Sequence, residues 1–146
     1  MRRFVLDASA LLMAFFPDEE GQETSQQLLA DWVRGEVEII APSLLCLEAT
    51  NAVLVALRRG RISQDKAHGI LRAINGLSIP TAEPLSTEEI FRIATEHNIS
   101  AYDATYASLA NDEVILITGD KRLFKALKEE GLAMLVREYQ QRPNSD

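Results

Sequence analysis

Two short apolar runs of the sequence each lead to an aspartate, and this pattern constrains the fold more than any other feature. Residues 4–6 (Phe-Val-Leu) run directly into Asp7, and residues 114–117 (Val-Ile-Leu-Ile) reach Asp120 three positions later. Short continuous apolar runs are typical of strands buried on both faces, as in a parallel sheet. Ligands of open α/β sheets bind outside the carboxyl ends of the strands. The two aspartates therefore predict an acidic site at one edge of a sheet.

Apolar periodicity and the Gly, Pro and Ser punctuation divide the chain into alternating strands and helices. We expect strands at 3–7, 37–41, 78–81, 114–118 and 133–136, and helices at 8–16, 22–34, 43–59, 63–75, 86–97, 101–111 and 121–130. This alternation predicts an α/β fold, a three-layer α/β/α sandwich around a central, mostly parallel sheet. The length fits one domain over residues 1–146, with an ordered core at about 2–137 and a polar C-terminal tail at 138–146.

Composition narrows the setting in which the protein works. No apolar stretch reaches the ~20 residues of a membrane span, so we expect no membrane association. Cys46 is the single cysteine, which excludes an internal disulfide and is typical of the cytoplasm. Because Cys46 stands in a dense apolar run, we expect a buried core thiol. The net charge of −7 disfavours non-specific coating of nucleic acid, although acids that hold a metal ion would not act against a local phosphate contact.

Glu48 is the only charged residue of the apolar segment 44–57. A carboxylate is costly to bury unless it is paired or binds a metal, and no basic residue lies within one helical turn of Glu48. Asn51 follows at i+3, so it projects on the same helical face. The alternative, an exposed stripe on a half-buried helix, stays open.

Each of the other acids has an ordinary structural explanation when it is taken alone. Asp7 and Asp120 stand where they can cap the helices that follow them. Asp103 comes three residues after Ser100, the spacing of a capping box. Capping and metal binding are compatible, because an acid is favoured at a helix N-terminus. If four carboxylates converge, they need a counter-charge, and oxygen ligands favour Mg²⁺ or Mn²⁺.

Four blocks of sequence carry a resemblance to a known family. They are Phe-Val-Leu-Asp-Ala-Ser at 4–9, Pro-Ser-Leu-Leu-Cys-Leu-Glu-Ala-Thr-Asn at 42–51, Ser-Ala-Tyr-Asp-Ala-Thr-Tyr at 100–106 and Thr-Gly-Asp-Lys-Arg-Leu at 118–123. With these blocks in this order over residues 4–136, the chain resembles the PIN-domain ribonucleases. It is most similar to the VapC toxins of bacterial and archaeal toxin–antitoxin systems.

The resemblance implies a Mg²⁺-dependent endoribonuclease, with Mn²⁺ as the alternative ion, that works as a toxin. The implied acidic quartet that holds the metal and hydrolyses RNA is Asp7, Glu48, Asp103 and Asp120, with Ser9, Asn51 and Thr118 in supporting positions. Asp7 and Asp103 are the expected direct ligands, whereas Gly119, where the family often has a larger residue, leaves the placement of Asp120 open. The implied partners are the RNA substrate, a VapB-type antitoxin and a second copy of the chain in a homodimer.

Basic and aromatic residues around these blocks are weaker candidates. Lys121 and Arg122, followed by Lys125, begin beside Asp120 and are expected to contact the RNA backbone. The arginines at 58, 59 and 61 suit the C-terminal end of a helix. Tyr102 and Tyr106 flank Asp103, and we expect them in the core or at the rim rather than in catalysis.

Other functions remain open at this point. One is a PIN-domain nuclease in housekeeping RNA processing, and another is a catalytically silent PIN-fold binding module. A phosphatase of the haloacid-dehalogenase type would need a second aspartate at position 9, where this chain has Ser9.

Overall fold

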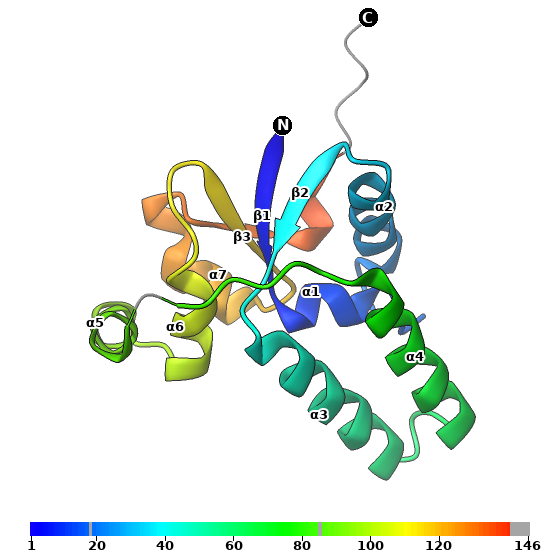
Figure 1. Cartoon of the computed structure of the whole chain (residues 1–146). Coiled ribbons are helices and arrows are strands. Elements are labelled where there is room, and N and C mark those ends of the chain that lie inside the picture. The colour runs from blue at the N-terminus through cyan, green and yellow to red at the C-terminus, as the bar shows by residue number, and fades with distance from the viewer. Residues whose placement is uncertain (18, 85, 141–146) are drawn as a thin grey trace, which may run out of the picture.

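The computed structural model describes residues 1–17, 19–84 and 86–140. Its centre is a sheet of four parallel strands in the order β2-β1-β3-β4 (Figure 1). The strands are β1 (Arg2–Leu6), β2 (Val37–Ile40), β3 (Val114–Thr118) and β4 (Ala133–Leu135). Phe4 of β1 lies opposite Ile39 of β2 and Ile115 of β3. The parallel sheet predicted from the apolar runs is confirmed.

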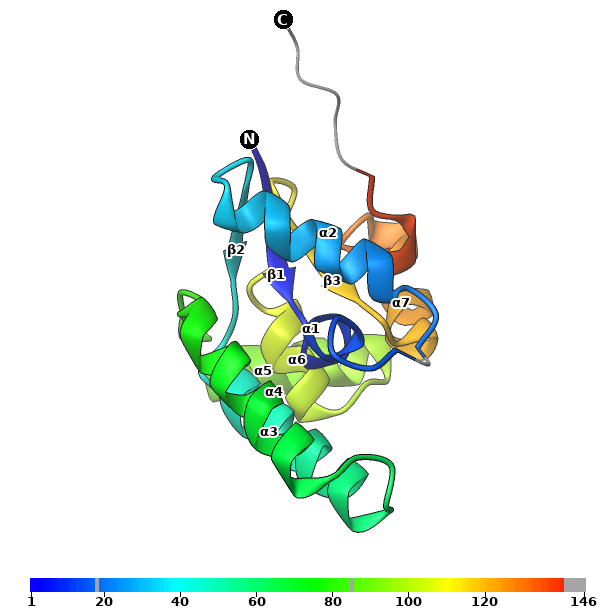
Figure 2. The ribbon, with the colours of Figure 1, turned by 90° about the vertical axis from the view of Figure 1, so that its right-hand side faces the viewer.

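Helices cover the sheet and extend beyond the ends of its strands. They are α1 (Ala8–Met13), α2 (Gln22–Val33), α3 (Leu44–Arg58), α4 (Gln64–Leu77), α5 (Thr87–His97), α6 (Ala101–Ala107) and α7 (Lys121–Leu127), with two 3-10 turns, η1 (Lys128–Glu130) and η2 (Val136–Glu138). Helix α2 crosses one face of the sheet and α6 lies beyond the other (Figure 2), which confirms the three-layer sandwich. The pair α3 and α4 projects past the carboxyl ends of the strands (Figure 1). Among the described residues, none of the helices is long and apolar enough to cross a membrane.

Serine side chains begin three of the helices. The hydroxyls of Ser63, Ser86 and Ser100 accept backbone N–H groups three residues later, at 3.1, 3.1 and 3.0 Å. Ser43, the first residue of the predicted helix at 43–59, makes no such bond because its own backbone is already helical (φ −57°, ψ −24°). An N-cap needs an extended backbone to turn its side chain back onto the first turn.

Residues 78–81 do not form the strand that we predicted. In the described structure this segment contributes one isolated parallel bridge, between Ala41 and Thr81. The carbonyl of Pro80 accepts a hydrogen bond from the Ala41 N–H, but proline has no N–H to continue a ladder. The predicted helix at 101–111 is also shorter, because α6 ends at Ala107.

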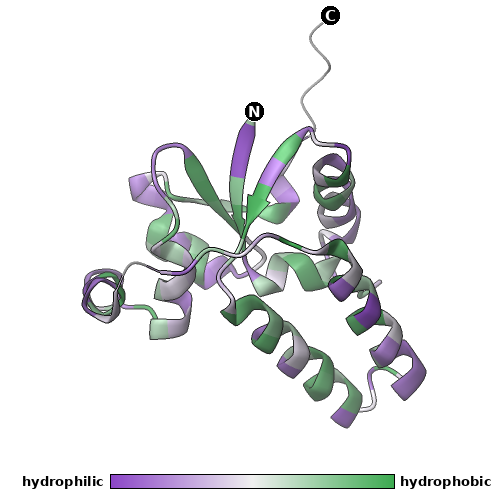
Figure 3. Cartoon of the chain, in the orientation of Figure 1, coloured by the Kyte–Doolittle hydropathy of each residue, from purple (hydrophilic) through white to green (hydrophobic). Residues whose placement is uncertain are grey.

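The core lies on both sides of the sheet and includes a residue that we assigned to the tail. Strand β3 is hydrophobic along its length (Figure 3), and Val5, Leu116 and Ile117 are completely buried. Tyr139 is buried as well and packs edge-on against Phe4, with 5.8 Å between ring centroids. The packed part of the chain thus reaches beyond residue 137. Residues 141–146 of the expected tail lie outside the described residues, and the single-domain boundary stays a prediction.

Cys46 is exposed, so the prediction of a buried core thiol is wrong. Helix α3 buries Leu45, Ala49 and Val53, a stripe at i, i+4 and i+8 that faces the rest of the protein. Cys46 and Leu47 fall outside this stripe although their neighbours are apolar. An apolar run on a helix shows that one face is buried, but it does not identify which residues of the run lie on that face.

Candidate active site

Asp7 occupies the position that the strand pattern predicted, at the carboxyl end of β1. Its backbone N–H donates to the Ile117 carbonyl at 3.1 Å, which joins the ends of β1 and β3. The side chain is only 7% exposed. Two hydroxyls donate to its Oδ2 atom, Ser9 Oγ at 2.6 Å and Thr118 Oγ1 at 2.7 Å. Asp7 stands at the N-cap of α1 but does not cap it with its side chain.

Ser9 and Thr118 connect Asp7 to the loop after β3. Their hydroxyl oxygens lie 3.2 Å apart. Ser9 Oγ accepts the N–H of Gly119 at 2.9 Å, and Thr118 Oγ1 accepts the N–H of Asp120 at 3.0 Å. Since each hydroxyl both donates to Asp7 and accepts a backbone N–H, the orientation of the carboxylate is coupled to that of the loop.

The surroundings of Asp7 favour its neutral form. Burial raises the pKa of Asp7 to about 6, and the hydrogen bonds from Ser9 and Thr118 offset only part of this effect. The charges of Asp103 and Glu48 raise the pKa further. Within the described residues no basic group forms an ion pair with Asp7. This carboxylate is therefore buried without the counter-charge that would normally accompany it.

The other predicted acids lie near enough to influence one another. Asp103 is half-buried in the first turn of α6, and Glu48 is half-buried in the second turn of α3. Burial raises the pKa of Asp103, the hydrogen bond with Ser100 opposes this, and the charge of Asp120 raises the pKa again. Asp7 is influenced by Asp103 and Glu48, and Asp103 by Asp120, so the four acids lie in one region at the carboxyl edge of the sheet.

Asp120 serves as the N-cap of α7. Its Oδ1 atom accepts the N–H groups of Arg122 at 2.9 Å and Leu123 at 3.3 Å. The preceding Gly119 is explained by close packing, because a Cβ there would lie 2.5 Å from Cε and 2.9 Å from Sδ of Met13. Met13 thus fills the space that a larger residue at position 119 would take. Asp120 is held by capping, with its Oδ1 atom already engaged by backbone N–H groups.

The donor groups are of the kind that a small hard cation prefers. In the described part of the chain, no three His, Cys, Asp or Glu side chains lie close enough together to hold an ion as they stand. The carboxylates are nevertheless oxygen ligands of the type that Mg²⁺ and Mn²⁺ select. Among the described residues, the buried Asp7 carboxylate has no cationic partner. This uncompensated carboxylate fits a cation in this region.

The predicted supporting and substrate residues lie at the rim. Asn51 is exposed and borders, with Glu48, Leu47 and Tyr102, a groove of about 440 Å³. No hydrogen bond joins Asn51 to Glu48 among the described residues. Lys121 and Arg122 are exposed at the start of α7 and border a second pocket of about 400 Å³ next to Asp120.

The arginines at 58 and 59 lie exposed at the end of α3 that is remote from the sheet (Figure 1). Arg61 instead contacts the Phe16 ring, with its guanidinium carbon 4.4 Å from the centroid, and pairs with Glu19 at 3.0 Å.

Tyr106 lies in the core, one of the two places that the sequence predicted for it. It is completely buried, yet its hydroxyl lies near the acids, since Glu48, Asp7 and Asp103 all raise its pKa in addition to the effect of burial. The signal available in the sequence was its i+3 spacing from Asp103, which places both side chains on one face of a short helix.

Comparison with models of protein families shows which family the chain belongs to. The model of the PIN domain matches residues 4–130, which is most of the chain and includes all four acids. The chain belongs to the PIN-domain family.

Several known proteins are similar to this PIN domain. Ribonuclease VapC1 of Mycobacterium tuberculosis is 33% identical over 86% of this chain and 92% of its own length. Ribonuclease VapC3 of Pyrobaculum aerophilum is 27% identical over 74% of this chain and 81% of its own length, and Exonuclease VapC9 of the same organism is 29% identical over 66% and 73%.

A solved structure shares the fold. The crystal structure of PAE2754 from Pyrobaculum aerophilum superposes with a TM-score of 0.69, at 26% identity over 92% of this chain and 91% of that one. These relatives confirm the resemblance to VapC proteins that the four sequence blocks indicated.

Proposed function

We propose that this PIN-domain protein is a Mg²⁺-dependent endoribonuclease that acts as the toxin of a toxin–antitoxin pair. The observation that carries the proposal is Asp7, a buried carboxylate that two hydroxyls orient and that has no counter-charge in the described part of the chain. The family match and the relatives named as ribonucleases support nuclease activity. Mn²⁺ is the alternative ion.

In the proposed site Asp7 and Asp103 would hold the ion, with Glu48 and Asp120 completing the acidic surroundings. When bound, the ion supplies Lewis-acid chemistry that stabilises charge on the attacked phosphate and makes water a better nucleophile. Ser9 and Thr118 keep Oδ2 of Asp7 engaged, and among the described residues its Oδ1 atom accepts no hydrogen bond. Half-buried Glu48 reaches solvent, which suits a group that takes up the proton of the attacking water.

Positive charge for the RNA backbone would come from Lys121 and Arg122, next to Asp120. The charge of Arg122 lowers the pKa of Asp103, so this guanidinium acts on the acidic site across α6 and α7. Asn51 would contact substrate at the opposite rim, on α3. RNA would then lie across the carboxyl edge of the sheet, between α3 and α7.

A cleavage assay tests the activity. Purified protein is incubated with structured linear RNAs and with a circular RNA, in Mg²⁺, Mn²⁺ or EDTA, beside Asp7→Asn and the matched surface variant Asp112→Asn. We expect Mg²⁺-dependent cleavage of both RNA forms by the wild type and Asp112→Asn only. Cleavage that persists in EDTA or in Asp7→Asn would refute the metal-nuclease proposal. Cleavage of linear RNA alone would indicate an exonuclease, the activity for which one relative is named.

The toxin role is tested in cells, where we also propose that the protein acts in the cytoplasm. Controlled expression in a bacterium should arrest growth, and Asp7→Asn should not. Cleavage in vitro without growth arrest would favour a housekeeping RNA-processing nuclease. A protein that neither cleaves RNA nor arrests growth would be a binding module that retains the PIN fold.

We also propose two protein partners, an antitoxin of the VapB type and a second copy of the chain. Three large apolar side chains are exposed beside the site, Leu47 at 68%, Phe91 at 70% and Tyr102 at 64%. The groove between Leu47 and Tyr102 opens onto Glu48, so an antitoxin segment bound there would cover an acid of the site. A neighbouring groove of about 480 Å³ contains Phe91 and suits the second copy. Phe91→Asp should convert a dimer to a monomer in sedimentation analysis, whereas Leu47→Asp should weaken antitoxin binding only.

A further inference from the structure

Tyr106 carries a buried hydroxyl that has no hydrogen-bond acceptor in the described part of the protein. The side chain is completely buried, and it is the largest of the completely buried side chains among the described residues. Buried polar atoms are almost always paired, so an unpaired one calls for an explanation. If the only role of this side chain were to fill space in the core, phenylalanine would serve equally well. The hydroxyl therefore needs a reason of its own.

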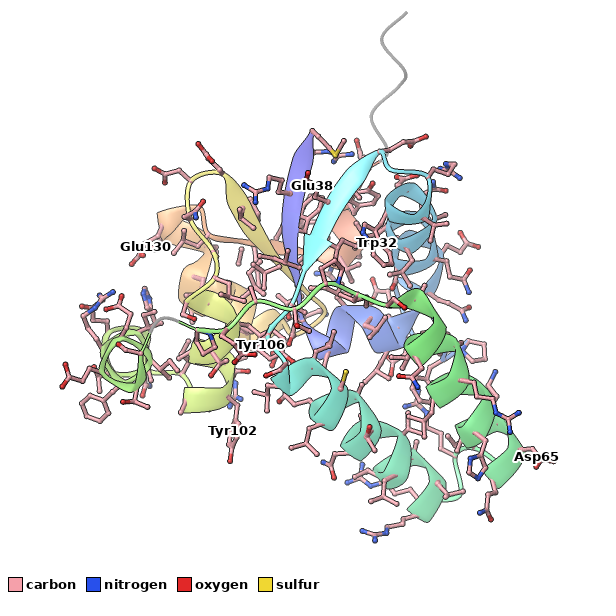
Figure 4. All side chains as sticks on the ribbon, viewed as in Figure 1. Trp32, Glu38, Asp65, Tyr102, Tyr106 and Glu130 are labelled. Atoms are coloured by element: carbon pink, nitrogen blue, oxygen red, sulfur yellow. The ribbon has the colours of Figure 1, made fainter. Side chains whose placement is uncertain are left out.

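The Tyr106 hydroxyl lies within the influence of the acids, although the residue belongs to the hydrophobic core. Tyr106 lies one turn after Asp103 on α6, and it stands where α6 approaches the start of α3 (Figure 4). Of the three acids that influence it, Glu48 acts most strongly, through hydrogen bonding as well as through its charge, although the two groups do not meet the geometry of a formed hydrogen bond. The charges of Asp7 and Asp103 follow. Tyr102, on the same helix, is exposed at the rim, whereas Tyr106 is buried (Figure 4).

The chemistry of the two groups is complementary. A tyrosine hydroxyl is protonated at neutral pH and can donate a hydrogen bond. An ionised glutamate has only acceptors, and a hydrogen bond from a hydroxyl to a carboxylate is among the stronger ones. Glu48 is half-buried on a long, rotatable side chain, and it is not yet close enough to the other acids to complete a metal site with them. A fixed donor beneath it would select one of its orientations.

We propose that Tyr106 is a positioning residue that donates its O–H to Glu48 and turns this carboxylate toward Asp7 and Asp103 when the site binds a divalent cation. This inference rests on the proposed function and adds to it a residue that acts through Glu48. The hydroxyl thereby gains its missing acceptor. Groups that orient metal ligands in this way typically change metal affinity 10- to 100-fold when they are removed.

The test is Tyr106→Phe, which keeps the ring and removes only the hydroxyl. Binding of Mn²⁺ to the intact protein is measured by calorimetry and by electron paramagnetic resonance, and thermal stability by scanning calorimetry. We expect Mn²⁺ affinity to fall about 10-fold and the melting temperature to stay the same or rise, because an unpaired buried hydroxyl is lost.

Two further variants separate positioning from packing. Tyr139→Phe removes the other buried tyrosine hydroxyl, which bonds to Asp31 away from the site, so it should lower the melting temperature and leave Mn²⁺ affinity unchanged. In a Glu48→Gln background, Tyr106→Phe should cause at most a twofold further loss of affinity. An unchanged affinity in Tyr106→Phe, or a full additional loss in the Glu48→Gln background, would overturn the inference.

These measurements also distinguish the inference from the function on which it rests. If the wild type binds Mn²⁺ and cleaves RNA but Tyr106→Phe binds Mn²⁺ equally well, the inference alone fails. If the wild type neither binds Mn²⁺ nor cleaves RNA, the proposed function fails and the positioning role of Tyr106 fails with it.

Discussion

Asp7 and Asp31 are both buried aspartates, but their surroundings differ in kind. Asp31, on α2, is 1% exposed and accepts hydrogen bonds from Gln27 at 2.7 Å, from Arg34 and from the Tyr139 hydroxyl. Its two oxygens are both engaged, and the Arg34 guanidinium supplies a counter-charge. Asp7 is 7% exposed and receives only two hydroxyl hydrogen bonds, both on Oδ2.

Asp31 is a carboxylate whose interactions are complete, whereas Asp7 is one that the described residues leave uncompensated. Asp31 joins α2 to the segment around Tyr139, so its interactions are complete within the protein. Asp7 is left with an uncompensated charge and one oxygen that accepts no hydrogen bond from the described residues. A buried charge without a partner is costly, and such a cost is tolerated where a ligand completes the site.

The largest expected effect is on catalysis. Asp7→Asn should reduce RNA cleavage roughly 100- to 1,000-fold, because bound metal contributes several kcal/mol to the transition state and each ~1.4 kcal/mol is tenfold in rate. The matched change Asp31→Asn should leave the rate per folded molecule within about twofold, as measured under single-turnover conditions. If Asp7→Asn and Asp31→Asn lost equal cleavage activity, the two aspartates would not differ in their importance for catalysis.

The second effect is a pH dependence of stability that belongs to Asp7. Its pKa is about 6 in the folded protein and 3.8 as a free group, so the folded state binds the proton more tightly. Stability from this group is therefore present below pH 4 and is lost as pH rises to 6, by about 3 kcal/mol. The raised pKa of Asp103 acts with the same sign.

Urea unfolding measures this pH effect. The Asp7→Asn protein should match the wild type near pH 4 and be more stable than it by about 3 kcal/mol at pH 7, in buffers with EDTA. A difference that is constant with pH would show that the folded-state pKa of Asp7 is not raised.

Metal binding should offset the loss of protein stability that the uncompensated charge of Asp7 causes. A cation at 100 times its dissociation constant stabilises the folded state by about 2.7 kcal/mol. We expect Mg²⁺ or Mn²⁺ to raise the melting temperature of the wild type and of Asp31→Asn, but not that of Asp7→Asn, in scanning calorimetry. If the melting temperature rose in all three proteins, the ion would bind at a site that does not include Asp7.

The structural role of Asp31 predicts a smaller loss of stability. Asp31→Asn removes a charge that holds Arg34 and Tyr139, and it should lower the free energy of unfolding by about 2 kcal/mol at pH 7. The Arg34 side chain is 48% exposed, so solvent screening keeps the effect below that of a fully buried pair. Chemical denaturation gives the value, and a neutral or stabilising result would contradict the assignment.

The smallest effects concern the rim. Lys121→Gln and Arg122→Gln should each raise KM a few-fold with little change in kcat, and each should make the dependence of log affinity on log salt shallower by roughly 0.7. Lys128→Gln, an exposed lysine on η1, is the matched control and should change neither. An unchanged salt dependence in the α7 variants would remove these residues from the RNA-binding surface.

Much of the fold was predictable because it depends on local patterns. Apolar runs that end in an aspartate identified β1 and β3, and the serine spacing identified the starts of α4, α5 and α6. The strand expected at 78–81 was wrong because Pro80 cannot continue a ladder. The buried assignment of Cys46 was wrong because periodicity does not determine which face of α3 meets the core.

The sequence by itself determined the chemical inventory of this protein: a parallel α/β sheet, four acids near its carboxyl edge, and the hydroxyls of Ser9 and Thr118 beside them. Only the tertiary structure decided which of these groups are compensated. It engages Asp120 in capping α7, satisfies Asp31 with Arg34 and Tyr139, and leaves Asp7 and the Tyr106 hydroxyl without full partners. The physical reason is that burial and hydrogen-bond partners depend on contacts between residues far apart in the chain, such as Thr118 with Asp7 and Tyr139 with Asp31.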